Sequence, residues 1–181
     1  FLIQEQIKGG VWAPSNEPLK IKEKIDFLKA NPSYNSSLVI LIDMRIPSGK
    51  NRFFVYDLKA DSVKTSGLVA HGSGSLTEKE DSLSFSNVPN SYQTSLGNYK
   101  IGSSYVGNFG KSYKLHGLDA TNSKALQRLI VLHPYSCVPD EEQLYPICNS
   151  LGCPMLSENF FEEVDSLIKK SGKSVLMEIY Y

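Results

Sequence analysis

The chain has 181 residues, of which 41% are hydrophobic and 21% charged, and its 19 basic and 19 acidic side chains give a net charge of zero. This length and composition predict a single globular domain and exclude a disordered, collagen-like or coiled-coil chain. Nucleic-acid binders usually carry an excess of basic charge, so we expect no nucleic-acid partner. No apolar run approaches the roughly 18 residues that a membrane-spanning helix needs.

The first 37 residues are expected to form an arm and a helix. Glycine and proline residues interrupt residues 1–16, which favours a loose arm. Apolar residues recur at helical spacing over residues 17–30, and Asn31 ends the pattern because the residue before a proline is disfavoured in a helix. We therefore divide the chain into an N-terminal arm and helix, residues 1–37, and a larger domain, residues 38–181.

The larger domain is expected to be mainly β with flanking helices (α+β). Its strands come in runs rather than alternating with helices, which argues against a doubly wound fold. The expected strands, helices and loop are strands at 38–44, 53–58 and 63–71, a long loop at 76–97, strands at 99–105 and 112–116, a short helix at 123–127, a strand at 129–133, a helix at 157–170 that Ser157 caps and Gly172 stops, and a last strand at 174–181.

Cys153 is a candidate nucleophile in the sequence Ser150-Leu151-Gly152-Cys153-Pro154. Pro154 keeps Cys153 in an extended conformation, and Gly152 allows the backbone to approach another group closely. This pattern predicts a thiol on a tight turn, beside backbone N–H groups that could stabilise an oxyanion. The alternative is an inert, buried cysteine, which is the commoner fate of a free thiol.

His133 is a candidate general base, 20 residues before Cys153. It ends the apolar run Leu129-Ile130-Val131-Leu132, which predicts a strand buried along its length and terminated by Pro134. A neutral imidazole at the end of such a strand could take the thiol proton. The alternative is a structural histidine that is hydrogen-bonded in the core.

The other two cysteines, Cys137 and Cys148, could form a disulfide that would leave Cys153 free. The three cysteines allow two other pairings, and either would block a nucleophile at Cys153. Their spacings do not fit a zinc site. The glycines at positions 72 and 74 match neither a dinucleotide-binding motif nor a phosphate-binding loop, so neither a metal nor a cofactor is expected.

The segment Arg128-Leu129-Ile130-Val131-Leu132-His133, followed by Ser150-Leu151-Gly152-Cys153-Pro154, resembles the catalytic domain of bacterial murein L,D-transpeptidases, in the subfamily whose cysteine motif ends in Gly-Cys-Pro. The resemblance runs from about residue 38 to residue 181. Four further segments carry it, namely Phe54–Leu58, Val69–Gly74, Phe85–Pro89 and Ser95–Tyr99. It implies an L,D-transpeptidase-like mixed β sandwich or barrel.

The resemblance also implies acyl transfer on peptidoglycan stem peptides. Cys153 would attack the carbonyl of the third stem residue and release the terminal D-alanine. His133 would act as base and then as acid, and the backbone N–H of Gly152 or Cys153 would hold the oxyanion. No metal or organic cofactor is needed. The expected residues on the substrate side are His71, Ser86, Asn87, Ser95 and Ser150.

Two departures from the family pattern leave alternatives open. Leu151 stands where the commoner form of the family has a second histidine, and Pro134 follows His133 where glycine or serine is usual. The family's third catalytic partner is often a backbone carbonyl beside the histidine, which Pro134 can still offer. The alternatives are a murein L,D-carboxypeptidase or another cysteine amide hydrolase, and a wall-binding domain without catalysis. By resemblance we expect a monomer that acts outside the bacterial cytoplasm, in the periplasm or cell envelope.

Overall fold

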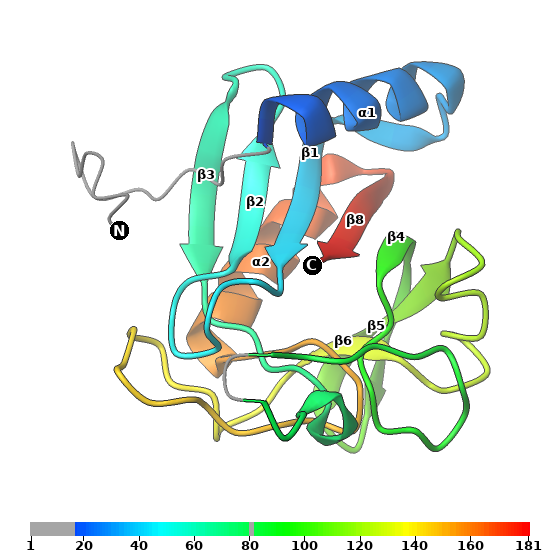
Figure 1. Ribbon diagram of the computed structural model, residues 1–181. Helices are drawn as coiled ribbons and strands as arrows, with labels where there is room; N and C mark the ends of the chain where they lie inside the picture. Colours follow the sequence, from blue (N-terminus) through cyan, green and yellow to red (C-terminus); the bar gives the residue numbers. More distant parts are fainter. Residues whose placement is uncertain (1–16, 80–81) are drawn as a thin grey trace, which may run out of the picture.

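Figure 1 shows a computed structural model that describes residues 17–79 and 82–181, so the arm expected over residues 1–16 lies outside the described residues. The described residues form one sheet of eight strands, in the order β3-β2-β1-β8-β4-β5-β6-β7, with two α-helices. The elements are α1 (Glu17–Ala30), β1 (Tyr34–Asp43), β2 (Phe53–Asp57), β3 (Ser62–Gly67), the 3₁₀ turn η1 (Ser73–Ser75), β4 (Gly97–Gly107), β5 (Gly110–Gly117), β6 (Val131–Pro134), β7 (Met155–Leu156), α2 (Glu158–Ser171) and β8 (Ser174–Tyr180). The expectation of a mainly β domain with flanking helices is confirmed.

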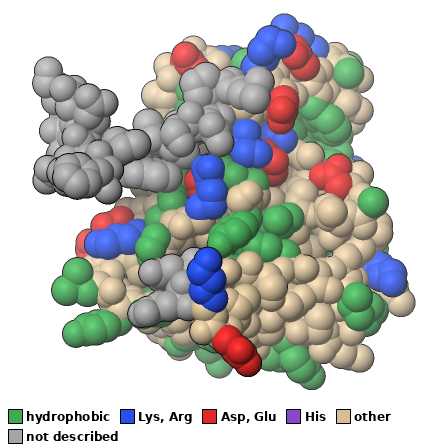
Figure 2. Space-filling model, viewed as in Figure 1, with side chains coloured by type: hydrophobic (Ala, Val, Ile, Leu, Met, Phe, Trp, Pro, Cys, Tyr) green, Lys and Arg blue, Asp and Glu red, His purple; other side chains and the backbone are tan. Residues whose placement is uncertain are grey.

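The sheet is mixed, because β1 pairs with β8 in parallel, β6 pairs with β7 in parallel, and the other neighbours are antiparallel. On the face drawn in Figure 2, acidic and basic side chains are interspersed, as the zero net charge would suggest. Among the described residues, no helix is long and apolar enough to cross a membrane.

The apolar run over residues 38–42 is explained by burial on both faces of the sheet. Ile40 and Ile42 pack in the cluster that α2 joins, whereas Val39 and Leu41 pack in the cluster that α1 joins. Successive side chains of a strand point to opposite faces, so a strand covered on both sides must be apolar throughout. Figure 1 shows the two helices on opposite sides of these central strands.

Helix α2 begins and ends where the sequence predicted. The Ser157 hydroxyl accepts a hydrogen bond from the Phe160 N–H, which satisfies one of the free donors of the first turn. Gly172 adopts the left-handed conformation at φ +65°, which ends the helix. The expected roles of Ser157 and Gly172 are confirmed.

The expected short helix at residues 123–127 is wrong, because the structure has turns there. The strand expected from Leu129 begins instead at Val131, and Leu129 is exposed with a left-handed φ of 57°. Helices and strands both need a negative φ, so neither can pass through Leu129 in this conformation. The apolar run was therefore a poor guide to burial at this position.

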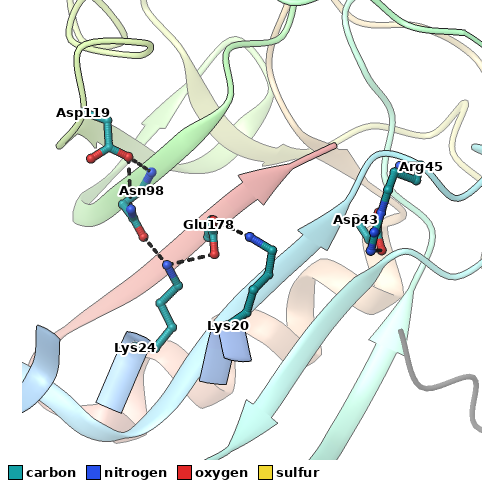
Figure 3. A network of polar contacts seen from close by, with 7 residues as sticks. All are labelled: Lys20, Lys24, Asp43, Arg45, Asn98, Asp119 and Glu178. Atoms are coloured by element: carbon teal, nitrogen blue, oxygen red, sulfur yellow. Dashed lines mark hydrogen bonds and ion pairs between the residues drawn. The ribbon is translucent and has the colours of Figure 1, made fainter. Parts of the chain in front are cut away.

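Helix α1 is tied to the sheet by charged groups as well as by apolar packing (Figure 3). Lys20 and Lys24 form ion pairs with Glu178 of β8, with N···O distances of 2.9 and 2.8 Å. Lys24 also donates to the side-chain oxygen of Asn98 at 2.6 Å, and Asp119 accepts two hydrogen bonds from Asn98. The network joins α1, β8 and β4.

Glu178→Ala is expected to lower the free energy of unfolding by about 3 kcal/mol, because it leaves the buried Lys24 ammonium without its counter-ion. Urea denaturation measures this loss. The matched control is Lys22→Ala, which removes an exposed ion pair with Asp26 and should cost no more than about 0.5 kcal/mol. Equal losses in the two variants would contradict the assignment.

Candidate active site

Cys153 lies on a tight turn that Ser150 holds together. The Ser150 hydroxyl accepts a hydrogen bond from the Gly152 N–H at 3.0 Å and donates one to the Cys153 carbonyl at 2.6 Å. The backbone N–H of Ser150 donates to the carbonyl of His71 at 2.8 Å, which fixes the turn to the segment after β3. Gly152 has a φ of +117°, a conformation that only glycine adopts without strain. Ser150 therefore positions Cys153.

The turn also needs glycine at position 72. A Cβ atom at Gly72 would lie 2.9 Å from the Cα and the N of Gly152 and still closer to the Tyr92 carbonyl. The two backbones therefore pack directly against each other. Gly72 is therefore required because its backbone lies so close to that of Gly152, whereas Gly152 is required because of its positive φ.

The half-buried Cys153 thiol is the free thiol of the chain and contacts the start of β6. The Val131 N–H donates to the sulfur at an N···S distance of 3.4 Å, and the sulfur donates to the Leu129 carbonyl at 3.7 Å. The left-handed conformation of Leu129 belongs to this contact, because this residue leads into β6 and supplies the acceptor. Backbone strain of this kind gathers at functional sites.

Burial raises the pKa of the Cys153 thiol, while the Val131 N–H and the positive charge of Arg128 lower it. Burial is the largest of the three effects. The resting sulfur is therefore a neutral thiol at neutral pH, and it needs a base to become a nucleophile.

His133 reaches the same site through the parallel pairing of β6 with β7. It stands opposite Met155, two residues beyond Cys153. Val131, whose N–H contacts the Cys153 sulfur, lies two residues before His133, roughly 6.6 Å along the strand. The described contacts include no hydrogen bond between the imidazole and the sulfur. Catalytic hydrogen bonds are often long without substrate and shorten when it binds.

The His133 ring is oriented by its own strand and by two aromatic rings. Its Nδ1 lies 3.0 Å from the Pro134 carbonyl, so Nδ1 carries the proton and Nε2 is left as the basic atom. Phe109 stacks on the ring at 4.3 Å between centroids, and Tyr135 packs edge-on. Burial lowers the pKa of His133, and the Pro134 carbonyl partly opposes that shift. The imidazole is therefore neutral at pH 7.

Sequence reasoning missed Phe109, which lies at the tip of the β4–β5 hairpin between Gly107 and Gly110. It remains about half exposed. A bulky aromatic residue in a predicted turn was the available signal. Its contact with the histidine depends on how the hairpin folds over β6, which the sequence did not show.

Arg128 holds the long loop beside Cys153. Its guanidinium donates to the carbonyls of Ser86 and Gln93 and to the hydroxyls of Ser91 and Ser95. Four acceptors from one loop satisfy most of the donors of a single guanidinium. The sequence analysis quoted Arg128 as part of a motif and gave it no role of its own.

The expected substrate-side residues fall in different places. Ser86 and Ser95 lie in the loop that Arg128 holds, and Asn87 joins that loop to the turn at residues 120–124 through three hydrogen bonds. Ser150 forms part of the turn that carries Cys153. The buried His71 ring points to Arg52, in a separate cleft. Substrate contact by these residues stays a prediction.

The loop between His133 and Cys153 is closed by a disulfide between Cys137 and Cys148. Beneath it, Val138 and Ile147 pack with residues of neighbouring segments in a small apolar cluster. The loop that carries the chain from His133 to Cys153 is thus anchored at both ends. Residues 17–79 and 82–181 hold no group of three or more side chains suited to a metal ion.

The chain belongs to the L,D-transpeptidase catalytic domain family, because the sequence model of that family matches residues 17–178. It is similar to solved L,D-transpeptidases from Xylanimonas cellulosilytica (12% identity, TM-score 0.43, 80% of this chain and 60% of that chain), Mycobacterium smegmatis (10%, 0.41, 80% and 59%) and Mycobacterium tuberculosis (14%, 0.40, 80% and 58%). This chain therefore spans about three fifths of their length. No curated protein matches it.

We expect Cys153 to react with iodoacetamide at a rate that rises with pH through a midpoint above that of an ordinary thiol, because burial raises its pKa. Arg128→Gln should move the midpoint further up by removing a positive charge, and Arg128→Lys should move it less. Peptide mass spectrometry without reductant measures the rate, since the disulfide keeps the other two cysteines unlabelled. A midpoint below the ordinary value would instead indicate a resting thiolate–imidazolium pair.

Ser150→Ala is expected to cost about 1–3 kcal/mol of stability, because it leaves the buried Gly152 N–H without an acceptor. Because the turn loosens, the labelling rate of Cys153 at a fixed pH should change as well. Urea denaturation and the labelling assay measure the two effects. Ser104→Ala, an exposed serine of β4, is the control and should alter neither.

Proposed function

We propose that the chain is a cysteine-dependent acyltransferase that acts on peptidoglycan stem peptides, as an L,D-transpeptidase. The observation that carries the proposal is the contact of the free Cys153 thiol with the strand that presents His133. Membership of the family supports the substrate class.

In the proposed first step, His133 Nε2 takes the thiol proton while the Cys153 sulfur bonds to the carbonyl carbon of the third stem residue. The lowered pKa of His133 and the raised pKa of Cys153 support a neutral starting pair, so the proton moves as the bond forms. The tetrahedral intermediate then expels the amine of the terminal D-alanine, which receives the proton from the imidazolium. A thioester on Cys153 remains.

In the second step, the amine of another stem peptide attacks the thioester, and His133 accepts its proton and returns it to the leaving sulfur. The product is an amide cross-link and a regenerated thiol. Water in place of the amine would give an L,D-carboxypeptidase. The two reactions share every residue of the site, so the acceptor and the exclusion of water decide between them.

We assign the oxyanion contact to the backbone N–H of Cys153. The Gly152 N–H, the other candidate, already donates to the Ser150 hydroxyl. The Cys153 N–H has no partner among the described hydrogen bonds, and it belongs to the residue that supplies the nucleophile. A donor fixed by the turn needs no reorganisation during the reaction.

The proposal keeps the division into residues 1–37 and residues 38–181 and takes the second part as the catalytic domain. It places the protein outside the cytoplasm as a monomer. The apolar packing of α1 on the sheet and its ion pairs with Glu178 support a role for this helix in holding the domain together.

Cys153→Ala is expected to abolish both transfer and release of D-alanine from a stem tetrapeptide, because no thioester can form. Mass spectrometry of the products, with and without an added acceptor peptide, separates cross-linking from hydrolysis. The wild-type chain should show an added acyl mass on Cys153 after a short incubation.

The acid limb of kcat/KM is expected below the ordinary histidine value of 6.5, because burial lowers the pKa of His133. Ser104→Ala is the matched control and should keep full turnover. Turnover in Cys153→Ala would refute the mechanism. A wild-type chain that binds stem peptides without turnover would favour the wall-binding alternative.

A further inference from the structure

A second cleft, of about 190 Å³, lies away from Cys153, between the turn after β1 and the segment that follows β3. Neither Cys153 nor His133 lines it. The cleft is smaller than a typical pocket for a drug-sized ligand and far larger than a single water needs. Its charged and titratable lining residues are Arg45, Arg52, His71 and Lys79, with no carboxylate among the described lining residues.

Arg52 is buried in this cleft, and no carboxylate of the described residues hydrogen-bonds to it. It is 1% exposed and donates to the carbonyls of Val69 and Ile46 and to His71 Nδ1. Those bonds use four of the five N–H donors of a guanidinium, so one Nη1–H has no described partner. Asp43 exerts only a longer-range attraction on Arg52 and is itself hydrogen-bonded to Arg45. Buried charges are normally paired, and among residues 17–79 and 82–181 no anion contacts this cation.

His71 supplies a second unused donor at the same place. Arg52 can only donate, so His71 Nδ1 must accept, and the proton of the neutral ring is on Nε2. Burial, together with the charge of Arg52, lowers the pKa of His71 to about 4, so the ring is neutral at pH 7. His71 is 4% exposed, and its Nε2 has no hydrogen-bond partner among the described residues. A buried N–H without an acceptor is costly.

We propose that this cleft binds a small carboxylate, whose two oxygens accept from Arg52 Nη1–H and His71 Nε2–H. Lys79 adds positive charge, whereas Arg45 is already paired with Asp43. Met44, Ile46 and Leu83 offer apolar contact to the body of the ligand. These apolar walls favour an organic acid over an inorganic anion. The proposal does not rest on the proposed acyl transfer. The carboxylate belongs either to a free small acid or to a peptide, and both present the same chemistry to the cleft.

The test uses Cys153→Ala, so that turnover cannot contribute, with butyrate as the probe and butyramide as its uncharged match. NMR titration follows the His71 ring resonances and gives the affinity. Butyrate should bind saturably and shift the His71 Nε2–H signal, whereas butyramide should bind at least roughly tenfold more weakly. Equal binding of the two probes, or no saturable binding of butyrate, would overturn the proposal.

Variants of the lining test the same point independently. His71→Phe removes the buried donor and should weaken butyrate binding roughly tenfold or more. If this variant does not fold, Lys79→Ala on the rim provides the test. Because it removes a positive charge, it should weaken butyrate binding and make that binding less sensitive to salt than in the parent. Lys64→Ala, an exposed lysine of β3, is the control and should bind as the parent does. Unchanged affinity in Lys79→Ala and in His71→Phe would refute the assignment.

A competition arm identifies the source of the carboxylate. A stem tetrapeptide is added to the butyrate complex, either with free carboxylates or with every carboxylate amidated. Displacement by the free form alone assigns the cleft to a peptide carboxylate. Saturable butyrate binding that neither peptide disturbs assigns it to a free small acid. Equal displacement by both forms would show that the charge is not recognised, which would contradict the proposal.

Discussion

The parallel pairing of two very short strands, β6 and β7, is the constraint on which the site depends. Parallel neighbours cannot be joined by a tight turn, so the chain must leave His133, run through a loop and return to place Cys153 beside the start of the same strand. The disulfide and the small apolar cluster beneath the loop hold this crossover in place. His133 and Cys153 then share one backbone frame, although 19 residues lie between them.

The segments around the thiol carry local strain that their neighbours stabilise. Leu129, Asn90 and Tyr92 have left-handed backbones without being glycine, and Gly152 has a φ of +117°. Their partners are well defined: Arg128 holds residues 86–95 through four hydrogen bonds, and the Leu129 carbonyl accepts from the thiol. Such conformations persist only where the surrounding contacts determine them. The position of the sulfur therefore depends on a rigid frame of loops.

Burial sets the protonation states of Cys153 and His133. Burial acts in opposite directions on an acid and on a base: it raises the pKa of the Cys153 thiol and lowers that of the His133 imidazole. Both shifts favour the neutral pair in the resting site. The same effect keeps His71 neutral in its own cleft, where Arg52 is a buried cation. The two sites thus differ in charge while sharing the segment at residues 71–72.

The sequence by itself determined the elements with strong local signals. An apolar run located the central strand β1, and the Ser157 cap and Gly172 stop bounded α2, because these patterns act over a few neighbouring residues. The motifs around His133 and Cys153 pointed to the family. Only the tertiary structure decided what depends on contacts between distant segments. These are the turn in place of a helix before Leu129, the stacking of Phe109 on the histidine, the loop held by Arg128, and the placing of His71 beside Arg52. Local pattern cannot set these contacts, because each is fixed by how separate parts of the sheet and its loops pack against one another.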